Sequence, residues 1–365
     1  MCSGYYSYAG GFDPQLPGMK SFAGQVVHPQ EWPEDLDYAG KQVVVVGSGA
    51  TAITLLPAMA DDTAHITMLQ RSPSYVAALP AEDAVADFLR RVLPAQTAHS
   101  IVRWKNATLS QIFYQFCRRA PKSATRLLQA GVRRRVGDAV AIDPHFTPAY
   151  RPWDQRLCMA PDGDLFETLK SGKASIVTDR IVTITPTGID LASGHHLEAD
   201  IIITATGLEM VAGGGISLSV DGVNVEVANE LVYKGLMFAD VPNFAWCVGY
   251  TNASWTLRAD LSSQYVCRFI NYLDEHDLDF GFPHNHDRKM ATRPVLDLDA
   301  GYVRRAADRL PKQGTKAPWQ LRQNYFRDSV TMHWSRVDQS MTFGRATAPK
   351  VGGQRAVSGQ RAKVD

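Results

Sequence analysis

Lys41-Gln-Val-Val-Val-Val-Gly47-Ser-Gly49-Ala-Thr-Ala52 is the stretch that decides the fold. A run of four valines enters a G-x-G-x-x-A turn, and an apolar segment compatible with a helix follows. Gly47 permits the tight turn, Gly49 lets the backbone approach a pyrophosphate, and Ala52 lets the helix pack closely on the strand. The pattern predicts a strand, turn and helix that bind a dinucleotide at the unpaired helix amides. The predicted cofactor contacts are Gly47, Ser48, Gly49, Ala50, Thr51 and Ala52.

The end of the next predicted strand, His65-Ile-Thr-Met-Leu-Gln70-Arg71, indicates which dinucleotide binds. NAD-binding units place an acidic residue about 20 residues beyond the glycines, where it accepts a hydrogen bond from the ribose. Here Gln70, Arg71 and Ser72 occupy that strand end. A carboxylate would repel a 2′-phosphate, whereas Arg71 would pair with it. The sequence therefore favours NADP over NAD, with a solvated charge at a strand end as the alternative for Arg71.

The composition is that of a globular protein, since 45% of the 365 residues are hydrophobic and 21% are charged. This length suffices for two domains, each with its own core. Lys and Arg number 38 and Asp and Glu 37, so the net charge of +1 gives no global electrostatic case for a nucleic acid or membrane partner. The five cysteines are scattered without a C-x-x-C pair, which favours reduced thiols. With neither a signal peptide nor a transmembrane run in the pattern, we expect a cytoplasmic protein.

The middle of the chain changes from helical to strand patterns. Pro57 lies inside the first helical pattern and predicts a kink or an early stop. Residues 83–136 have helical spacing and carry two basic clusters, typical of a solvated helix face, with peripheral membrane contact or phosphate binding as the alternative. Short β-branched runs from Ser175 to Leu197 predict a small antiparallel meander.

Two further strands are predicted after the meander. Asp200–Ile203 is apolar and leads into Ala205-Thr206-Gly207, which predicts a core strand that ends in a glycine turn. Asn243–Tyr250 predicts another buried strand, followed by a loop and a helix that runs to about Asn271.

Upstream of the glycine turn, Phe22-Ala-Gly24-Gln-Val-Val-His28-Pro-Gln-Glu-Trp32-Pro33 matches the pattern F-x-G-x-x-x-H-x-x-x-W-P. This pattern is the fingerprint of Baeyer-Villiger monooxygenases, a group of flavin-containing monooxygenases, and the chain resembles their EthA-like branch from Cys2 to about Arg345. The resemblance also rests on Asp154-Gln-Arg156-Leu-Cys158, Ala205-Thr206-Gly207, Gly249-Tyr250-Thr-Asn-Ala-Ser-Trp255-Thr and Leu310-Pro-Lys-Gln. Together these motifs are far more specific than the glycine turn alone.

The resemblance implies FAD in one domain, NADPH in a second, and a flavin peroxide that transfers one atom of molecular oxygen to a carbonyl compound or to a sulfur or nitrogen atom. Arg156 resembles the catalytic arginine of the family, whose charge would hold the flavin peroxide as an anion and polarise the substrate carbonyl. A surface ion pair with Asp154 is the alternative for Arg156.

The remaining site residues also follow from the resemblance. Phe22, Gly24, His28 and Trp32 resemble the linker that couples NADP binding to the flavin domain, and we expect a positioning role for His28. Ala205, Thr206 and Gly207 are the other expected cofactor contacts.

The sequence also departs from the family pattern. A complete member opens with its own G-x-G-x-x-G turn for FAD and an active-site aspartate, whereas Cys2-Ser3-Gly4-Tyr5 resembles the motif that closes the first FAD segment. We therefore expect an α/β protein with two dinucleotide-binding, three-layer, Rossmann-like domains, the FAD domain being incomplete at its N-terminus. The expected division is 1–24 for the end of the FAD segment and linker, 25–205 for the NADP domain with its helical insertion, 206–345 for the C-terminal part of the FAD domain, and 346–365 for a disordered tail.

Two other functions are weighed against a monooxygenase. A non-catalytic NADP-binding remnant or half-protein would need a partner chain for FAD. A disulfide reductase of the same architecture would need a redox cysteine pair, which the scattered cysteines do not offer. His284-Asn-His286-Asp287 is typical of a solvated loop, so no metal site is predicted. The sequence does not specify the substrate.

Overall fold

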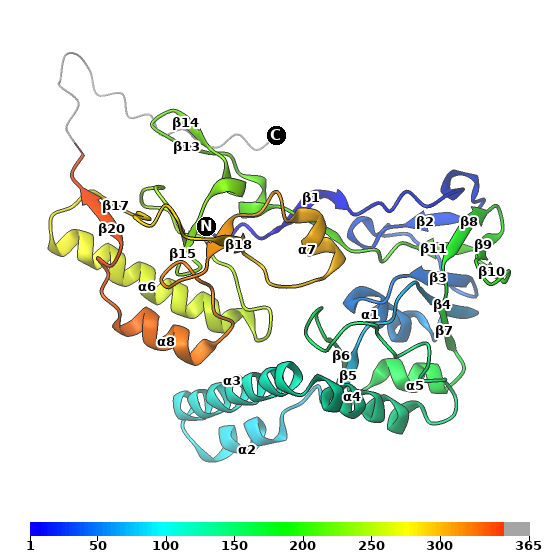
Figure 1. Cartoon of the computed structure of the whole chain (residues 1–365). Helices are drawn as coiled ribbons and strands as arrows, with labels where there is room; N and C mark the ends of the chain where they lie inside the picture. The colour runs from blue at the N-terminus through cyan, green and yellow to red at the C-terminus, as the bar shows by residue number, and fades with distance from the viewer. Residues whose placement is uncertain (347–365) are drawn as a thin grey trace.

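The computed structural model describes residues 1–346 and contains a five-stranded sheet. Its strands lie in the order β2 (Gln25–Val27), β11 (Ile201–Ile203), β3 (Gln42–Val46), β4 (His65–Gln70) and β7 (Ala174–Thr178), and each neighbouring pair is parallel. The valine strand β3 lies in the middle of the sheet (Figure 1). The predicted first strand and the predicted core strand within 200–203 are confirmed.

Different layers cover the two faces of this sheet, because successive side chains of a strand point to opposite faces. Val43 and Val45 pack against a layer of helices formed by α1 (Ala50–Met59), α4 (Pro121–Val136) and α5 (Asp164–Lys170). Val44 and Val46 pack against an antiparallel sheet of β8 (Ile181–Thr185), β9 (Gly188–Leu191) and β10 (His196–Glu198). The result is a three-layer arrangement with the valine strand at its centre.

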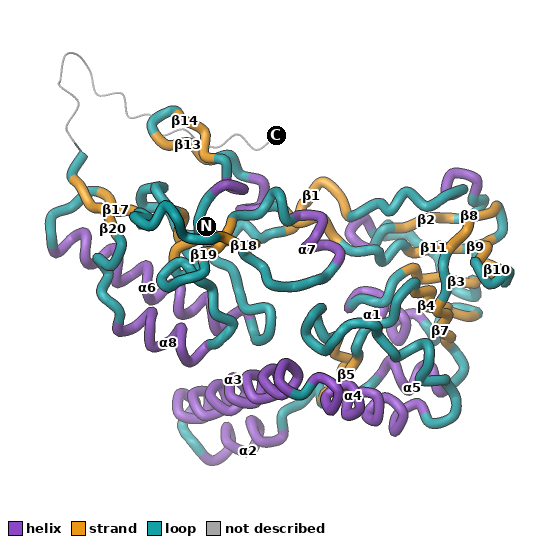
Figure 2. Tube along the Cα trace, viewed as in Figure 1, coloured by secondary structure: helices purple, strands orange, loops and turns teal. Residues whose placement is uncertain are grey.

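The predicted helical segment is confirmed and consists of α2 (Ala84–Val92), α3 (Ala95–Arg119) and α4. Asp83 caps α2, because its carboxylate accepts a hydrogen bond from the Ala86 amide. These helices form an elongated layer along one edge of the molecule (Figure 2). The parallel pair β5 (Val76–Leu79) and β6 (Cys158–Pro161) lies where the chain enters and leaves this layer. In the described part of the chain, no helix combines the length and the apolar character needed to cross a bilayer.

The second half of the chain is built around α6 (Trp255–Glu275), which confirms the helix predicted there. One hydrophobic core forms where α6 packs on α8 (Tyr325–Trp334), and a second hydrophobic core forms around the short strands. The other elements of this half are β12 (Leu208–Met210), β13 (Leu218–Val220), β14 (Val223–Val225), β15 (Val232–Tyr233), β16 (Met237–Phe238), β17 (Phe280–Pro283), β18 (Thr292–Pro294), α7 (Gly301–Ala306), β19 (Lys312–Gly314) and β20 (Met341–Gly344). Short 3-10 helices cover Met19–Ser21, Pro29–Glu31, Ala212–Gly215 and Val227–Asn229.

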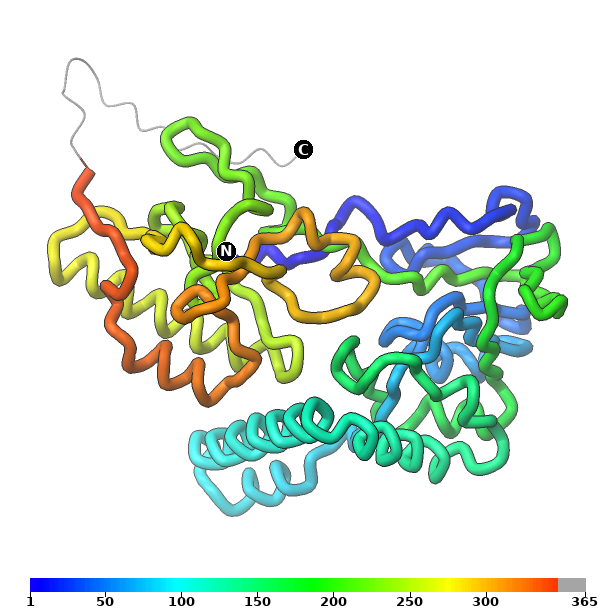
Figure 3. Tube along the Cα trace, in the orientation of Figure 1, coloured from blue at the N-terminus to red at the C-terminus, as the bar shows by residue number. Residues whose placement is uncertain are grey.

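Two segments far apart in the sequence run side by side between the two halves (Figure 3). β1 (Tyr6–Gly11) pairs with β12 in antiparallel orientation. The contact continues past the strands, because the Phe12 amide donates to the Gly207 carbonyl over 3.0 Å and Thr206 Oγ1 donates to the Phe12 carbonyl over 2.7 Å. We call this pair of segments, 6–12 and 206–210, the connecting ribbon.

Two strand predictions are wrong. Ser175–Val177 lies in β7 and pairs in parallel with β4, so it belongs to the main sheet and only β8, β9 and β10 form the antiparallel meander. Asn243–Tyr250 forms no strand, because a strand needs one continuous neighbour and the amides of this segment donate to three separate places. These bonds run from Asn243 to Gly281, from Trp246 to Leu236 and from Cys247 to Met1.

Two predictions concern where elements end. α1 ends at Met59, shortly after Pro57, which confirms the early stop. The predicted disordered tail lies, from residue 347 onward, outside the described residues.

Lys234 has a buried amine in the core of the second half. The residue is only 4% exposed. Its Nζ donates to Ser335 Oγ over 2.6 Å and to Tyr265 Oη over 3.3 Å, and it lies 4.4 Å from the centre of the Tyr265 ring. Burial, together with repulsion from Arg268, lowers the pKa of Lys234 to about 7.

This burial predicts a stability that rises with pH. The unfolded chain keeps the Lys234 proton up to the ordinary pKa of 10.5, whereas the folded chain releases it near 7, so the unfolded state binds more protons between these values. The free energy of unfolding of the wild type, relative to that of Lys234→Met, should therefore increase between about pH 7 and about pH 9. Urea denaturation at both pH values measures this difference, and an unchanged difference would contradict the burial of a titrating amine.

Candidate functional site

The turn between β3 and α1 has the geometry that the glycine pattern predicts. Gly47 has a φ of 148°, and a Cβ there would lie 2.3 Å from the Ala205 carbonyl oxygen, so no larger residue fits without movement. Gly49 precedes α1, and a Cβ there would meet no atom within 4 Å. Ala52 is fully buried against the sheet. The first-turn amides of α1 have no acceptor within the helix and lie beside the free space at Gly49, which fits a pyrophosphate.

Ser48, Ala50 and Thr51 lie between the glycine turn and the loop after β4. Ala50 and Thr51 are exposed in the first turn of α1. Ser48 Oγ donates to the Ser72 carbonyl over 2.9 Å and lies 3.1 Å from Ser74 Oγ. These contacts fix the loop after β4 beside the phosphate turn.

Gln70 and Arg71 are neighbours in sequence but have different surroundings. Gln70 is only 2% exposed, and its Nε2 donates to the His145 carbonyl and to Thr178 Oγ1, each over 2.8 Å. Gln70 therefore stabilises the end of β4 through hydrogen bonds inside the protein. Arg71 is exposed directly after the strand, so the prediction of a 2′-phosphate contact rests on Arg71 and the neighbouring Ser72.

His28 links the fingerprint to the connecting ribbon. Its Nδ1 accepts from the Gln30 amide over 3.2 Å, so Nε2 carries the proton and donates to the Gly207 carbonyl over 3.2 Å. The imidazole lies directly against the backbone of Gly11, where a Cβ would come within 1.8 Å of the ring. The geometry supports a positioning role, since both ring nitrogens are engaged with backbone groups.

The other fingerprint residues surround the edge strand β2. Phe22 packs into the core between the two sheets, and Trp32 packs into the core on the helical side. A Cβ at Gly24 would lie 2.1 Å from the Asp200 carbonyl oxygen, so this position requires glycine. The fingerprint therefore wraps around the sheet edge that leads to the connecting ribbon.

Arg156 comes from the first half of the chain and reaches the second half. Its Nη2 donates to the Tyr250 carbonyl over 3.3 Å. Asp154 forms its ion pair with Arg118, over 2.6 Å, and within residues 1–346 no ion pair joins Asp154 to Arg156. The alternative of a surface pair with Asp154 is therefore wrong.

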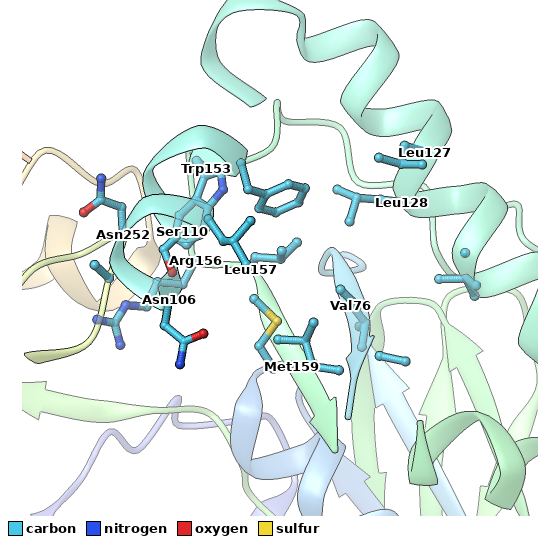
Figure 4. Close-up of a pocket in the computed structure, with 18 of the residues that line it drawn as sticks. Val76, Asn106, Ser110, Leu127, Leu128, Trp153, Arg156, Leu157, Met159 and Asn252 are labelled. Atoms are coloured by element: carbon cyan, nitrogen blue, oxygen red, sulfur yellow. The ribbon is translucent and has the colours of Figure 1, made fainter. Parts of the chain in front are cut away.

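A cavity of about 1270 Å³ opens between the helical layer and the β5–β6 pair. Arg156, Asn106 and Asn252 lie together at one end of it (Figure 4). The rest of the lining in this view is mainly apolar, with Val76, Leu127, Leu128, Leu157 and Met159. Four charged residues also belong to the lining, namely Arg134, Arg135, Glu167 and Lys170. A large space with an apolar part and several polar groups is typical of a site for a small organic molecule.

Neutral groups surround Arg156 on the side away from this cavity. Arg156 also lines a smaller cavity with Tyr6 and Tyr302. Burial raises the pKa of both tyrosines, and the charge of Arg156 opposes the two shifts. Burial likewise raises the pKa of the Cys158 thiol to about 11, again against Arg156. Because these groups stay protonated at neutral pH, none of them cancels the positive charge of Arg156.

Comparisons with known proteins identify the family of this chain. Residues 1–97 match the family described as flavin-binding monooxygenase-like. The chain is 50% identical to the FAD-containing monooxygenase EthA of Mycolicibacterium smegmatis, over 93% of this chain and 69% of that protein. The chain belongs to the flavin-binding monooxygenase-like family. It is also 45% identical to the probable FAD-binding monooxygenase AlmA of Acinetobacter baylyi, over 96% of this chain and 72% of that protein.

Solved structures of monooxygenases share the fold. An oxidized steroid monooxygenase bound to NADP has a TM-score of 0.66 at 18% identity, over 92% of this chain and 73% of that chain. OTEMO in complex with FAD and NADP has a TM-score of 0.59 at 21% identity, and the present chain spans 62% of its length. The predicted α/β fold and the predicted resemblance to the flavin-binding monooxygenase-like family are confirmed.

The sequence assigned no role to several residues that the structure places at the site of this flavin-binding monooxygenase-like chain. Tyr5 stacks on Trp255, with ring centres 4.4 Å apart, next to Arg156. Gly249 allows this arrangement, since a Cβ there would lie 2.1 Å from the Trp255 ring. Tyr250 Oη donates to the Asp328 carboxylate over 2.8 Å, which holds the carbonyl that Arg156 contacts. The motif Gly249–Trp255 was the sequence signal for these residues, but only the contacts in the structure show that they surround Arg156.

Two glycine variants should separate nucleotide binding from folding. Gly49→Ala places a methyl group in open space with an ordinary φ of −82°, so it should keep its melting temperature but bind NADPH about 10-fold or more weakly. Gly47→Ala should instead lower the free energy of unfolding by about 1–3 kcal/mol, because of backbone strain and the clash with Ala205. Thermal melts and NADPH fluorescence titrations measure both effects. Unaltered NADPH affinity in Gly49→Ala would contradict the phosphate site.

Arg71→Ala should change the choice between dinucleotides. Loss of one charge-assisted contact should raise the Kd for NADPH by about 10- to 100-fold and leave the Kd for NADH unchanged. Arg309→Ala, which removes an exposed arginine from the second half of the chain, serves as the matched control. An equal loss of affinity for both dinucleotides would show that Arg71 does not read the 2′-phosphate.

Proposed function

We propose that this chain catalyses an FAD- and NADPH-dependent monooxygenation, in which one oxygen atom is inserted next to a carbonyl group or added to a sulfur or nitrogen atom. The observation that carries the proposal is the position of Arg156. Arg156 belongs to the first half of the chain, donates to the Tyr250 carbonyl of the second half, and lines one end of the large cavity. The names of the relatives in the family support the same class of reaction.

The two cofactors would be held by different parts of the chain. We assign NADPH to residues 25–205, because the parallel sheet and the phosphate turn lie within this range. We assign FAD to 206–345 together with 1–24, because β1 pairs with β12 in the connecting ribbon. This division makes the ribbon the boundary between the two cofactors.

The residues at the two predicted cofactor positions fit these groups. The open space at Gly49, the first-turn amides of α1 and the exposed Arg71 would hold the phosphates of NADPH. Beside the ribbon, Gly207 has a φ of 99°, and a Cβ there would meet only Arg305, at 3.9 Å, so its backbone is open to a planar ligand. Thr206 supports this turn through its bond to Phe12. FAD, when bound, supplies the chemistry that activates molecular oxygen.

Arg156 would stabilise the negative charge that develops on the substrate oxygen. Its charge is not cancelled, because Tyr6, Tyr302 and Cys158 are neutral. The apolar side chains of the lining would lower the local dielectric, which would strengthen the attraction between the guanidinium and a developing oxyanion. His28 would keep Gly207 in place through its hydrogen bond to that carbonyl.

A second candidate is an NADP-binding protein that needs a separate chain for FAD. The observation that favours it is that Gly47–Ala52 is the one stretch of the sequence that fits G-x-G-x-x-G or G-x-G-x-x-A. Visible absorption of the purified chain, after FAD has been added and the excess removed, distinguishes the two candidates when NADPH binding is followed by fluorescence. Retained flavin supports the monooxygenase, whereas NADPH binding without flavin supports the second candidate.

Arg156→Ala should remove oxygenation without removing NADPH binding. The loss of this charge should lower kcat by about 10²- to 10³-fold, because it acts on charge that develops during the reaction. Arg156→Lys should recover part of the activity, since it restores the charge without the planar guanidinium. The measurement is product formation from a ketone and from a thioether, alongside the Kd for NADPH. Full activity of Arg156→Ala would exclude Arg156 from catalysis.

A further inference from the structure

The positive charge of this chain is concentrated in its helical layer. Residues 82–136 contain eleven Lys and Arg against three Asp and Glu, although the whole chain has 38 against 37. The helical layer is therefore strongly basic, and the remainder of the molecule is acidic. Such a separation is independent of the predicted cofactor sites, which lie at the sheet and at the connecting ribbon.

The hairpin formed by α2 and α3 also exposes large apolar side chains. On α2, Val85, Phe88 and Val92 are 51%, 62% and 56% exposed. Their spacing of three and four residues places them on one face of the helix, while Ala86 on another face is buried. This short helix therefore directs its apolar face away from the protein core, which is the reverse of an ordinary surface helix.

α3 continues the same combination of apolar and basic side chains. Ile101 and Ile112 are 44% and 61% exposed, and Arg119 at the end of the helix is exposed as well. Separations of 11 and 18 residues correspond to whole numbers of helical turns, so these three side chains share one face. α2 lies against α3 at the outer edge of the molecule (Figure 1).

We propose that the α2–α3 hairpin binds the surface of an anionic lipid bilayer. Val85, Phe88 and Val92 would enter the boundary between headgroups and acyl chains, as in other interfacial amphipathic helices. Arg90, Arg103, Lys105 and Arg118 form ion pairs with aspartates. The basic residues of the helical layer that form no ion pair within the described residues, among them Arg91, Arg119 and Lys122, would attract the anionic headgroups. The acidic remainder of the chain would orient the molecule with this edge toward the membrane.

Charge and apolar exposure together favour a bilayer over a second copy of this chain or a nucleic acid as the partner of the hairpin. A second copy of this chain would bring an equally basic hairpin to the same place, and the two would repel each other. A nucleic acid would satisfy the arginines but would leave the aliphatic side chains of α2 without a partner. An anionic bilayer matches both the charge and the apolar face.

Co-sedimentation of the full chain with vesicles tests the proposal. We expect binding to vesicles of phosphatidylcholine with phosphatidylglycerol, at least about 10-fold weaker binding to pure phosphatidylcholine, and a loss of affinity as salt increases. The triple variant Val85→Ser, Phe88→Ser, Val92→Ser should bind the anionic vesicles at least about 10-fold more weakly. A control variant, Val223→Ser with Val330→Ser, replaces similarly exposed valines in the second half and should bind like the wild type.

A second set of variants tests the charge separately and does not depend on the fold of α2. Arg91→Gln, Arg119→Gln and Lys122→Gln together should weaken binding to anionic vesicles and flatten its salt dependence. The proposal is overturned if the wild type does not bind anionic vesicles at low salt, or if it binds pure phosphatidylcholine equally well. It is also overturned if light scattering shows a dimer that the triple serine variant abolishes, or if single-stranded RNA prevents vesicle binding by occupying the hairpin.

Discussion

The close approach of Gly47 to the Ala205 carbonyl is the contact on which the rest of the structure depends. β3 and β11 run in parallel at the centre of the sheet, so the phosphate turn and the Ala205–Gly207 turn leave the sheet at the same edge. The carbonyl occupies the space of a side chain at residue 47, which sets the path of the nucleotide turn. The backbone that follows Ala205 enters the connecting ribbon. The contact between Gly47 and Ala205 therefore links the predicted nucleotide site to the start of the second half.

Arg156 lies between residues of the two halves of the chain, which the connecting ribbon joins. From the second half come the Tyr250 carbonyl and the Trp255 ring, and from the first half comes the apolar lining of the cavity. His28 stabilises the ribbon where it leaves the sheet, through its bond to Gly207. Burial keeps the neighbouring tyrosines protonated, so they do not cancel the positive charge of the guanidinium where it lines the two cavities. A positive charge in this position would stabilise negative charge that develops on a bound molecule.

Local sequence patterns correctly predicted the elements whose formation depends on residues close together in the sequence. The valine strand, the glycine turn, the helix after Ser254 and the helices of 84–136 follow from periodicity and turn chemistry, and all are present. The errors concern pairing. Ser175–Val177 has the same β-branched character as the meander that follows it, yet it joins β4. Asn243–Tyr250 is apolar enough for a strand but has no continuous neighbour to pair with. Which segments lie side by side depends on contacts distant in sequence.

The sequence by itself determined the α/β class, the nucleotide turn and the membership of the flavin-binding monooxygenase-like family, because each depends on residue types at fixed short spacings. Only the tertiary structure decided that Gln70 faces the interior while Arg71 is exposed, that Asp154 pairs with Arg118 and leaves Arg156 to Tyr250, and that the apolar face of α2 points outward. Each of these depends on the environment that distant segments create around a side chain. Short-range patterns fix the backbone, whereas burial and partners, and therefore charge and chemistry, are fixed by the fold.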